Sequence, residues 1–154
     1  MGGIDAPLNN YGIQQARILA EQLGCYNVSR IYCSPLSRAY GTAVEIQKQQ
    51  RSASIVVVDE LRERSLGLFE GMEKNEVNRQ GMMCSNVVEP LQKLMKRLKK
   101  AFSQIERDEV VVVVSHSAVF RCLVSDLGYV SRPKVDRLDN GQYVELYGGF
   151  DLAK

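Results

Sequence analysis

VVVVVSHS, at residues 110–117, is the stretch that decides the fold. An unbroken run of five valines predicts a strand that is buried on both faces, as in a parallel sheet covered by helices. The polar residues that follow mark the carboxyl end of this strand, and a helical pattern runs from Ala118 to Leu127. We therefore predict a strand over Val110–Ser115 that lies in the centre of a mostly parallel sheet.

Strand-like and helix-like segments alternate along the rest of the chain. Further strands are predicted at Arg30–Cys33, Ile55–Val58 and Gln142–Tyr147, the last toward an edge of the sheet. A first helix is predicted after an Asn9 cap, with its inward positions at Ile13, Ala16, Leu19, Ala20 and Leu23. A second helix is predicted to start at Ser34-Pro35, where Ser34 is the N-cap and proline takes the first helical position. A third is predicted from the helical spacing of Leu91, Leu94, Leu98, Phe102 and Ile105. This alternation predicts an α/β fold, a three-layer sandwich with helices on both faces of the sheet. The polar stretch 71–86 is predicted to be an irregular, mobile loop.

The composition and net charge of the chain indicate which classes of partner are not expected. The 154 residues suit a single domain over 1–154, and a net charge of +2 gives no strong bias toward nucleic acid or a membrane surface. No apolar run approaches the length of a membrane span. Four cysteines, at 25, 33, 84 and 122, form no CxxC pair, and the chain holds one histidine, so we expect no zinc site. We interpret the cysteines as reduced thiols of a cytoplasmic protein.

Three polar residues follow predicted strands. Arg38 lies in the first turn after Arg30–Cys33, Glu63 lies beyond Ile55–Val58, and His116 ends the valine strand. Ligands of open α/β sheets bind beyond the carboxyl ends of the strands, and an arginine, a histidine and free helix N–H groups suit a phosphoryl group. A nearby carboxyl suits a general acid. Taken singly, each residue also has an ordinary interpretation: a surface arginine, a surface ion pair, or a structural histidine.

Four sequence blocks carry a family resemblance. GGIDAPLNNYGIQQA at 2–16, SPLSRA at 34–39, LRER at 61–64 followed by Gly67 and FEG at 69–71, and VSHS at 114–117 resemble, in order, motifs of the histidine phosphatase (phosphoglycerate mutase-like) superfamily. The resemblance implies that family's fold and a phosphoric monoester hydrolase that acts on a phosphorylated small molecule without a metal or cofactor.

The resemblance also implies residue roles. Arg38 resembles the second phosphate-clamping arginine, His116 the second histidine that holds the phosphoryl group, and Glu63 the proton donor to the leaving oxygen. The implied substrate-binding positions are Gly2, Ser117 and Arg64.

One family motif is absent from the sequence. An Arg-His-Gly motif ends the family's first strand, and its histidine becomes phosphorylated; this chain has no such motif, and His116 is already assigned. We expect an N-terminally truncated domain lacking about twenty residues of the first βα unit. The loss would leave an open strand edge that invites a homodimer. We predict an enzyme when the upstream segment is present and inactivity of the given chain. The alternative is a pseudophosphatase that binds a phosphorylated ligand or a protein partner.

The branch of the family is indicated by two segments. HSAVFRCL at 116–123 and LRER at 61–64 resemble the fructose-2,6-bisphosphatase branch. Mutases typically carry Asn where this chain has Ala118, and a longer insertion where this chain is compact. Both features favour a phosphatase over the other alternative, a phosphoglycerate mutase. A serine hydrolase built on Ser115 or Ser117 is not expected, because the G-x-S-x-G elbow is absent and a base adjacent in sequence is poorly placed.

Overall fold

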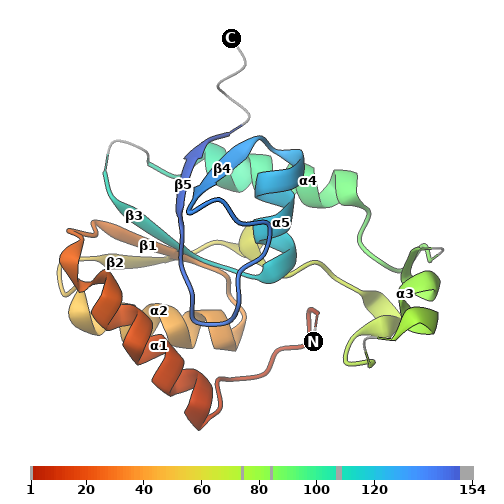
Figure 1. Cartoon of the computed structure of the whole chain (residues 1–154), viewed down its shortest axis with the longest axis horizontal. Helices are drawn as coiled ribbons and strands as arrows, with labels where there is room; N and C mark the ends of the chain where they lie inside the picture. The colour runs from red at the N-terminus through yellow and green to blue at the C-terminus, as the bar shows by residue number, and fades with distance from the viewer. Residues whose placement is uncertain (1, 74, 84, 107–108, 150–154) are drawn as a thin grey trace.

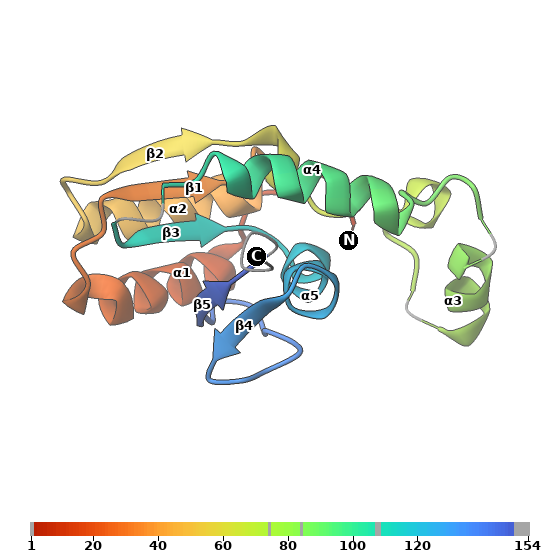
Figure 2. The same ribbon diagram turned by 90° about the horizontal axis from the view of Figure 1, so that it is seen from above.

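A parallel three-stranded sheet forms the middle layer of the molecule. The computed structural model of the chain describes residues 2–73, 75–83, 85–106 and 109–149. The sheet has the order β2-β1-β3, with β1 (Arg30–Cys33), β2 (Ser54–Val57) and β3 (Val111–Val114) all parallel. One face is covered by α1 (Asn10–Gln22) and α2 (Ser37–Gln49), the other by α4 (Leu91–Ser103) and α5 (Ser117–Asp126) (Figures 1 and 2).

Alternation along the strands explains the three layers. On β1, Ile31 and Cys33 pack into the cluster under α1 and α2, whereas Tyr32 packs into the cluster under α4 and α5. The valines of β3 divide in the same way between the two clusters. A strand whose two faces are both covered has to be apolar at every position. The predicted three-layer α/β sandwich is therefore confirmed.

The helices are those that the apolar spacing predicts, with one shifted start. Asn9 caps α1, where its Oδ1 accepts the N–H of Gly12 at 2.8 Å, as predicted. Helix α4 buries Leu94, Leu98 and Phe102. The prediction that Ser34 caps α2 and Pro35 begins it is wrong by two residues, because Ser34 caps a short turn through the N–H of Leu36 and the helix begins at Ser37.

The predicted central position of the valine strand is wrong for the described sheet. β1 lies in the centre, and β3 pairs with β1 alone among the described strands. An apolar pattern reports that two faces are covered, but it carries no information on how many strand neighbours there are. The β3 valines are accordingly only half-buried.

The last predicted strand belongs to a second sheet. β5 (Glu145–Gly148), expected at Gln142–Tyr147 on the main sheet, instead pairs antiparallel with β4 (Tyr129–Arg132), which the sequence analysis missed. Leu146 of β5 still packs against the cluster that holds Val111 and Val113. The hairpin therefore extends the core beyond β3 without hydrogen bonding to it in the described part of the chain.

The remaining segments are short. The stretch predicted as an irregular loop contains α3 (Glu76–Met83), which stands away from the sheet in Figures 1 and 2. Single-turn helices lie at Leu23–Cys25, Asp59–Leu61 and Gly67–Phe69. Cys33 and Cys122 are buried free thiols and Cys25 is exposed; Cys84 lies outside the described residues. Among the helices in the described ranges, none is both long and apolar enough to span a membrane.

Candidate functional site

The carboxyl ends of the three parallel strands meet at one edge of the sheet. Ser34 follows β1 and is fully buried, and Arg38 lies one turn farther along in α2. Glu63 follows β2 after one 3-10 turn, and His116 follows β3 and caps α5. Because the strands are parallel, these residues reach the same edge. Here the structure brings Arg38, Glu63 and His116 together.

Glu63 connects the loop after β2 to the start of α5. Its Oε1 accepts the N–H of Arg64 at 3.0 Å and the N–H of Ala118 at 3.1 Å. Burial raises the pKa of this carboxyl, and the two N–H donors and the charges of Arg38 and Arg121 only partly offset that rise. A carboxyl with a raised pKa is suited to give and take a proton near neutral pH.

His116 is held as a neutral ring. Its Nε2 shares a hydrogen bond of 2.8 Å with the Oγ of Ser34. Burial lowers the pKa of His116 to about 3, and the charges of Arg38 and Arg97 act in the same direction. Ser34 was not predicted as a site residue, although its place directly after a buried strand was a usable signal.

Arg38 ties the N-terminal segment to the site. Its Nη1 donates to the carbonyl of Ile4 at 2.6 Å, and its Nη2 donates to the carbonyl of Gly2 at 2.8 Å. Gly2 adopts a positive φ of 55°, where a side chain would be strained. Gly2 therefore reaches the site through its backbone, while the guanidinium of Arg38 is fixed in direction by two carbonyl oxygens.

A second anchor, which the sequence analysis also missed, holds the same segment. Asp5 accepts the N–H of Ser37 at 2.7 Å and its Oγ–H at 3.0 Å, so it caps the start of α2 from a distant part of the chain. These hydrogen bonds lower the pKa of Asp5. The capping pattern cannot be read from local sequence, because the two residues are 32 positions apart.

The other two predicted substrate-binding residues differ in placement. Ser117 is exposed at the first position of α5, directly beside His116. Arg64 is directed toward the segment before α4, where its Nε donates to the carbonyl of Glu89 at 2.8 Å. Ser117 therefore lies at the site, whereas the side chain of Arg64 is hydrogen-bonded to the segment before α4.

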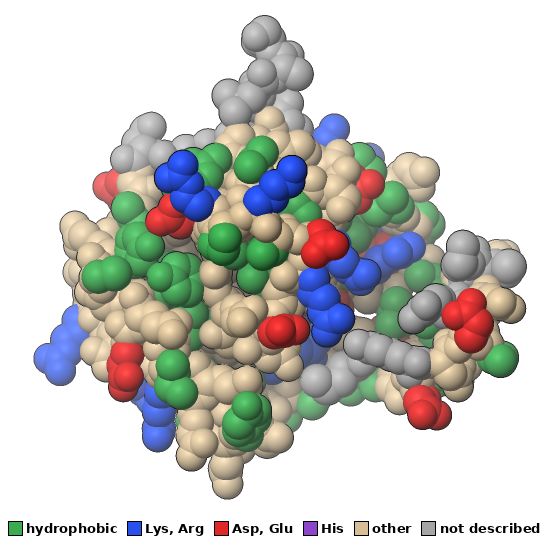
Figure 3. Space-filling view, viewed as in Figure 1, with side chains coloured by type: hydrophobic (Ala, Val, Ile, Leu, Met, Phe, Trp, Pro, Cys, Tyr) green, Lys and Arg blue, Asp and Glu red, His purple; other side chains and the backbone are tan. Residues whose placement is uncertain are grey.

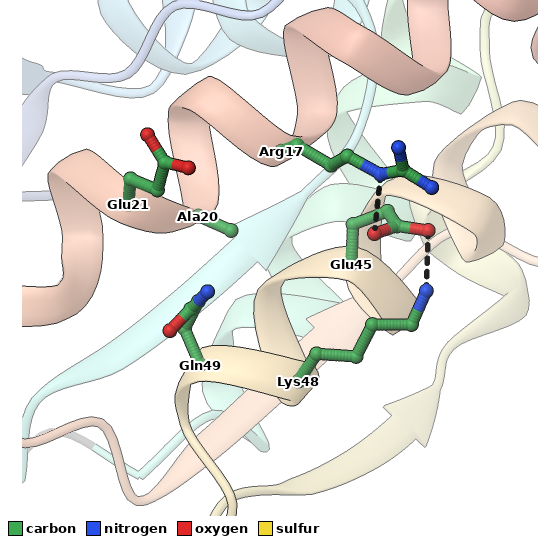
Figure 4. A pocket seen from close by; sticks show the side chains of 6 residues that line it. All are labelled: Arg17, Ala20, Glu21, Glu45, Lys48 and Gln49. Carbon is green, nitrogen blue, oxygen red and sulfur yellow. Dashed lines mark hydrogen bonds and ion pairs between the residues drawn. The ribbon is translucent and has the colours of Figure 1, made fainter.

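Charged side chains of both signs lie on the face that Figure 3 shows. Figure 3 shows Lys and Arg side chains gathered beside a hollow that opens between the body of the molecule and the α3 segment. Within the described ranges, no three His, Cys, Asp or Glu side chains are grouped so that they could hold a metal ion. A separate pocket lies between α1 and α2 (Figure 4) and is lined by Arg17, Ala20, Glu21, Glu45, Lys48 and Gln49.

Comparison with known proteins identifies the family. The model of the family described as "histidine phosphatase superfamily (branch 1)" matches residues 1–147. Phosphoglycerate mutase-like protein 4 of Arabidopsis thaliana is 31% identical over 170 residues, which cover 99% of this chain and 73% of the relative. The uncharacterized phosphatase PhoE of Bacillus subtilis is 32% identical over 132 residues, which cover 82% of this chain and 67% of the relative. The chain belongs to the histidine phosphatase superfamily.

A solved structure agrees with this fold. A mycobacterial glucosyl-3-phosphoglycerate phosphatase superposes with a TM-score of 0.70 at 24% identity, over 81% of this chain and 69% of the other. The predicted family and its fold class are therefore confirmed.

Proposed function

We propose that this chain carries the phosphate-binding and proton-donating half of a phosphatase that hydrolyses a phosphate monoester through a phosphohistidine. The observation that supports this most is the meeting of Arg38, Glu63 and His116 at one sheet edge, with the Glu63 carboxyl bonded to the helix that His116 begins. Phosphatase-named relatives support the same reaction class. The substrate we propose is a phosphorylated small molecule.

Each of the three residues has a step in this reaction. Arg38 is held by hydrogen bonds to two carbonyl oxygens, and its remaining N–H donors and positive charge would bind the phosphoryl oxygens. A histidine nitrogen attacks phosphorus, the bond to the leaving oxygen breaks, and Glu63 gives that oxygen its proton. Water then attacks the phosphohistidine, Glu63 takes the proton of the water, and phosphate leaves. His116 holds the phosphoryl oxygens in both steps.

The attacking histidine has to be a second one. The chain contains a single histidine, and we assign it to holding the phosphoryl group from the side. The β3 edge that faces away from β1 is the place we propose for the strand that brings the nucleophile. Its four valines lack the charges, prolines and bulges that usually protect an edge, and the β4–β5 hairpin packs on the same core beyond it. A parallel strand there would end beside His116.

The direct test is to add a strand that carries the missing histidine. An apolar strand ending in Arg-His-Gly is fused ahead of residue 1 to give what we call the complemented protein, and the matched control ends in Arg-Gln-Gly. We expect only the complemented protein to release phosphate from an aryl phosphate and to carry phosphate on the added histidine, as detected by mass spectrometry. Robust turnover by residues 1–154 alone, with phosphate trapped on His116, would contradict the proposal.

Ligand binding tests the half-site on its own. Because there is one histidine, its ring gives a single set of NMR signals that needs no assignment. Inorganic phosphate should raise the pKa of His116 from its value of about 3, since a dianion beside the ring stabilises the protonated form. The Arg38→Ala variant should lose this response. An unchanged titration of the wild-type ring at saturating phosphate would remove the ligand-binding role.

The open edge also leads us to propose a homodimer paired through β3. Light scattering should give a dimer for residues 1–154 and a monomer for the complemented protein, because the added strand would occupy the edge. A monomer in both cases rejects the dimer and leaves the phosphatase proposal standing.

We also propose a cytoplasmic location, which two buried free thiols, Cys33 and Cys122, support.

A further inference from the structure

The side chain of Arg97 in α4 hydrogen-bonds to backbone carbonyls of the loop that carries Glu63. Its Nη1 donates to the carbonyl of Arg62 at 2.8 Å and makes a very short hydrogen bond to the carbonyl of Glu60. Its Nη2 donates to the carbonyl of Glu63 itself at 3.3 Å. A guanidinium offers five donors in one plane, so a single side chain fixes three carbonyl groups of this loop.

Glu89, just before α4, hydrogen-bonds to the part of the same loop that follows Glu63. Its N–H donates to the carbonyl of Ser65 at 2.9 Å, and its Oε2 accepts the N–H of Ser65 at 3.4 Å. Its carbonyl accepts from Arg64, as described above. Arg97 and Glu89 therefore hydrogen-bond to residues that precede and follow Glu63 in the chain.

Arg97 and Glu89 also form an ion pair with each other. Arg97 Nε lies 2.8 Å from Glu89 Oε1, and Arg97 Nη2 lies 2.9 Å from Oε2, a bidentate pair. Their side chains are 18% and 9% exposed. Burial by itself would raise the pKa of Glu89, but its hydrogen bonds to Arg97 bring that pKa below the ordinary value. The pair stays charged and therefore rigid at neutral pH.

We infer that Arg97, locked by Glu89, is a positioning residue for the proposed acid Glu63. It sets the place of the Glu63 carboxyl against the N–H of Ala118 without touching the reacting atoms. The inference rests on the proposed function, in which Glu63 donates the proton. It follows from the contacts above, since no other described side chain binds the Glu60, Arg62 and Glu63 carbonyls together.

The test compares Arg97→Met and Arg97→Lys with the wild type. The Glu63 carboxyl is titrated by carbon-13 NMR, with Glu63→Gln used to identify its signal. Charged groups facing that carboxyl are Arg38 of α2 and Arg121 of α5, and neither is changed. We expect the raised pKa of Glu63 to fall in Arg97→Met, because a loop without these hydrogen bonds is more mobile and lets water reach the carboxyl. The amide exchange of Ala118 should rise on the order of tenfold, the equivalent of one weakened hydrogen bond.

Arg97→Lys should rescue the change only in part, since an ammonium group lacks the planar fork. The matched control is Lys100→Met on the same helix, whose ion pair with Glu60 at 2.5 Å is solvent-exposed at the lysine. It should leave both readouts unchanged. A Glu63 pKa and an Ala118 exchange rate that stay the same in Arg97→Met would overturn the inference. If Arg97→Met fails to fold, Glu89→Gln, which keeps the shape of the side chain, supplies the same comparison.

Failure of this inference is distinguishable from failure of the proposed function. In the complemented protein, Arg97→Met should lower turnover of an alkyl phosphate about tenfold more than turnover of an aryl phosphate, because only the poor leaving group needs the proton. Equal loss on both substrates would contradict positioning of the acid. Loss of phosphate binding in the wild type would instead contradict the proposed function, whatever the Glu63 pKa does.

Discussion

Two arginine–glutamate clusters in this molecule use the same chemistry but differ in how far their cations are exposed to solvent. At the sheet edge, Arg97 and Glu89 are 18% and 9% exposed and share their hydrogen bonds with the loop backbone. Between α1 and α2, Arg17 and Lys48 both reach Glu45, whose side chain is 13% exposed, but these two cations are themselves 62% and 57% exposed (Figure 4). The first cluster fixes a loop, whereas the second lines an open pocket and fixes no backbone that carries a site residue.

The difference is one of solvent. An exposed ion pair is screened by water and salt and contributes little, whereas a buried charge that loses its partner is left in a poorly solvating medium. In the pocket between α1 and α2, the hydrogen bond from Lys48 outweighs burial and lowers the pKa of Glu45. At the sheet edge, burial is the leading cause of the pKa shifts of Glu63 and His116.

The largest expected effect is on the buried cluster. Glu89→Ala removes the carboxylate and leaves Arg97 with carbonyl partners only, so we expect a loss of about 3 kcal/mol in the free energy of unfolding. Urea unfolding at pH 7 measures it. Glu45→Ala is the matched change in the exposed cluster and should cost at most about 1 kcal/mol. Equal losses in the two variants would show that burial does not separate the clusters.

The sequence predicted the layers better than it predicted the sheet. Apolar spacing identified α1, α4, α5 and the two-faced valine strand, because each pattern reports on local burial. It misplaced β3 at the centre and missed β4, since strand pairing depends on residues far apart in the chain.

The site divides in the same way. Arg38, Glu63 and His116 were predicted from their positions after strands and from motif order, both of which are local signals. The Asp5 cap and the hydrogen bonds of Arg97 and Glu89 join residues up to 37 positions apart and carry no local pattern. No local pattern separates Arg97 from Lys100 in α4, and the structure shows that their side chains are 18% and 64% exposed.

A second effect should appear as an acid-sensitive stability of the site. The pKa of His116 is about 3 in the folded protein and about 6.5 when unfolded. The folded state thus holds fewer protons, so its stability is fully present above pH 6.5 and is lost as the pH falls toward 3. We expect the wild type to lose about 2 kcal/mol more than His116→Gln between pH 7 and pH 4.5. Parallel curves for the two proteins, measured by urea unfolding, would place the ring in water.

A smaller effect of the opposite sign is expected at Glu63. Its folded pKa is raised, so the stability of its protonated form is present below the unfolded pKa and is lost as the pH rises through the folded one. Glu63→Gln keeps an oxygen to accept the Ala118 N–H but removes the buried charge. It should stabilise the protein by about 1 kcal/mol at pH 7 and by nothing at pH 4. Destabilisation at pH 7 would mean that the carboxylate is well solvated.

The smallest effect should be that of Arg17→Ala in the exposed cluster. Arg17 Nε lies 3.4 Å from Glu45 Oε2, a long contact, and the hydrogen bond that lowers the Glu45 pKa most comes from Lys48. Removing Arg17 therefore leaves Glu45 paired, and alanine gains slightly in helix propensity. The free energy of unfolding should stay within about 0.5 kcal/mol of the wild type, and the difference should vanish in 1 M salt, where the screening length is about 3 Å. A loss that approaches that of Glu89→Ala and persists in salt would show that the α1–α2 pocket excludes water, and the contrast between the two clusters would then have to rest on their backbone contacts alone.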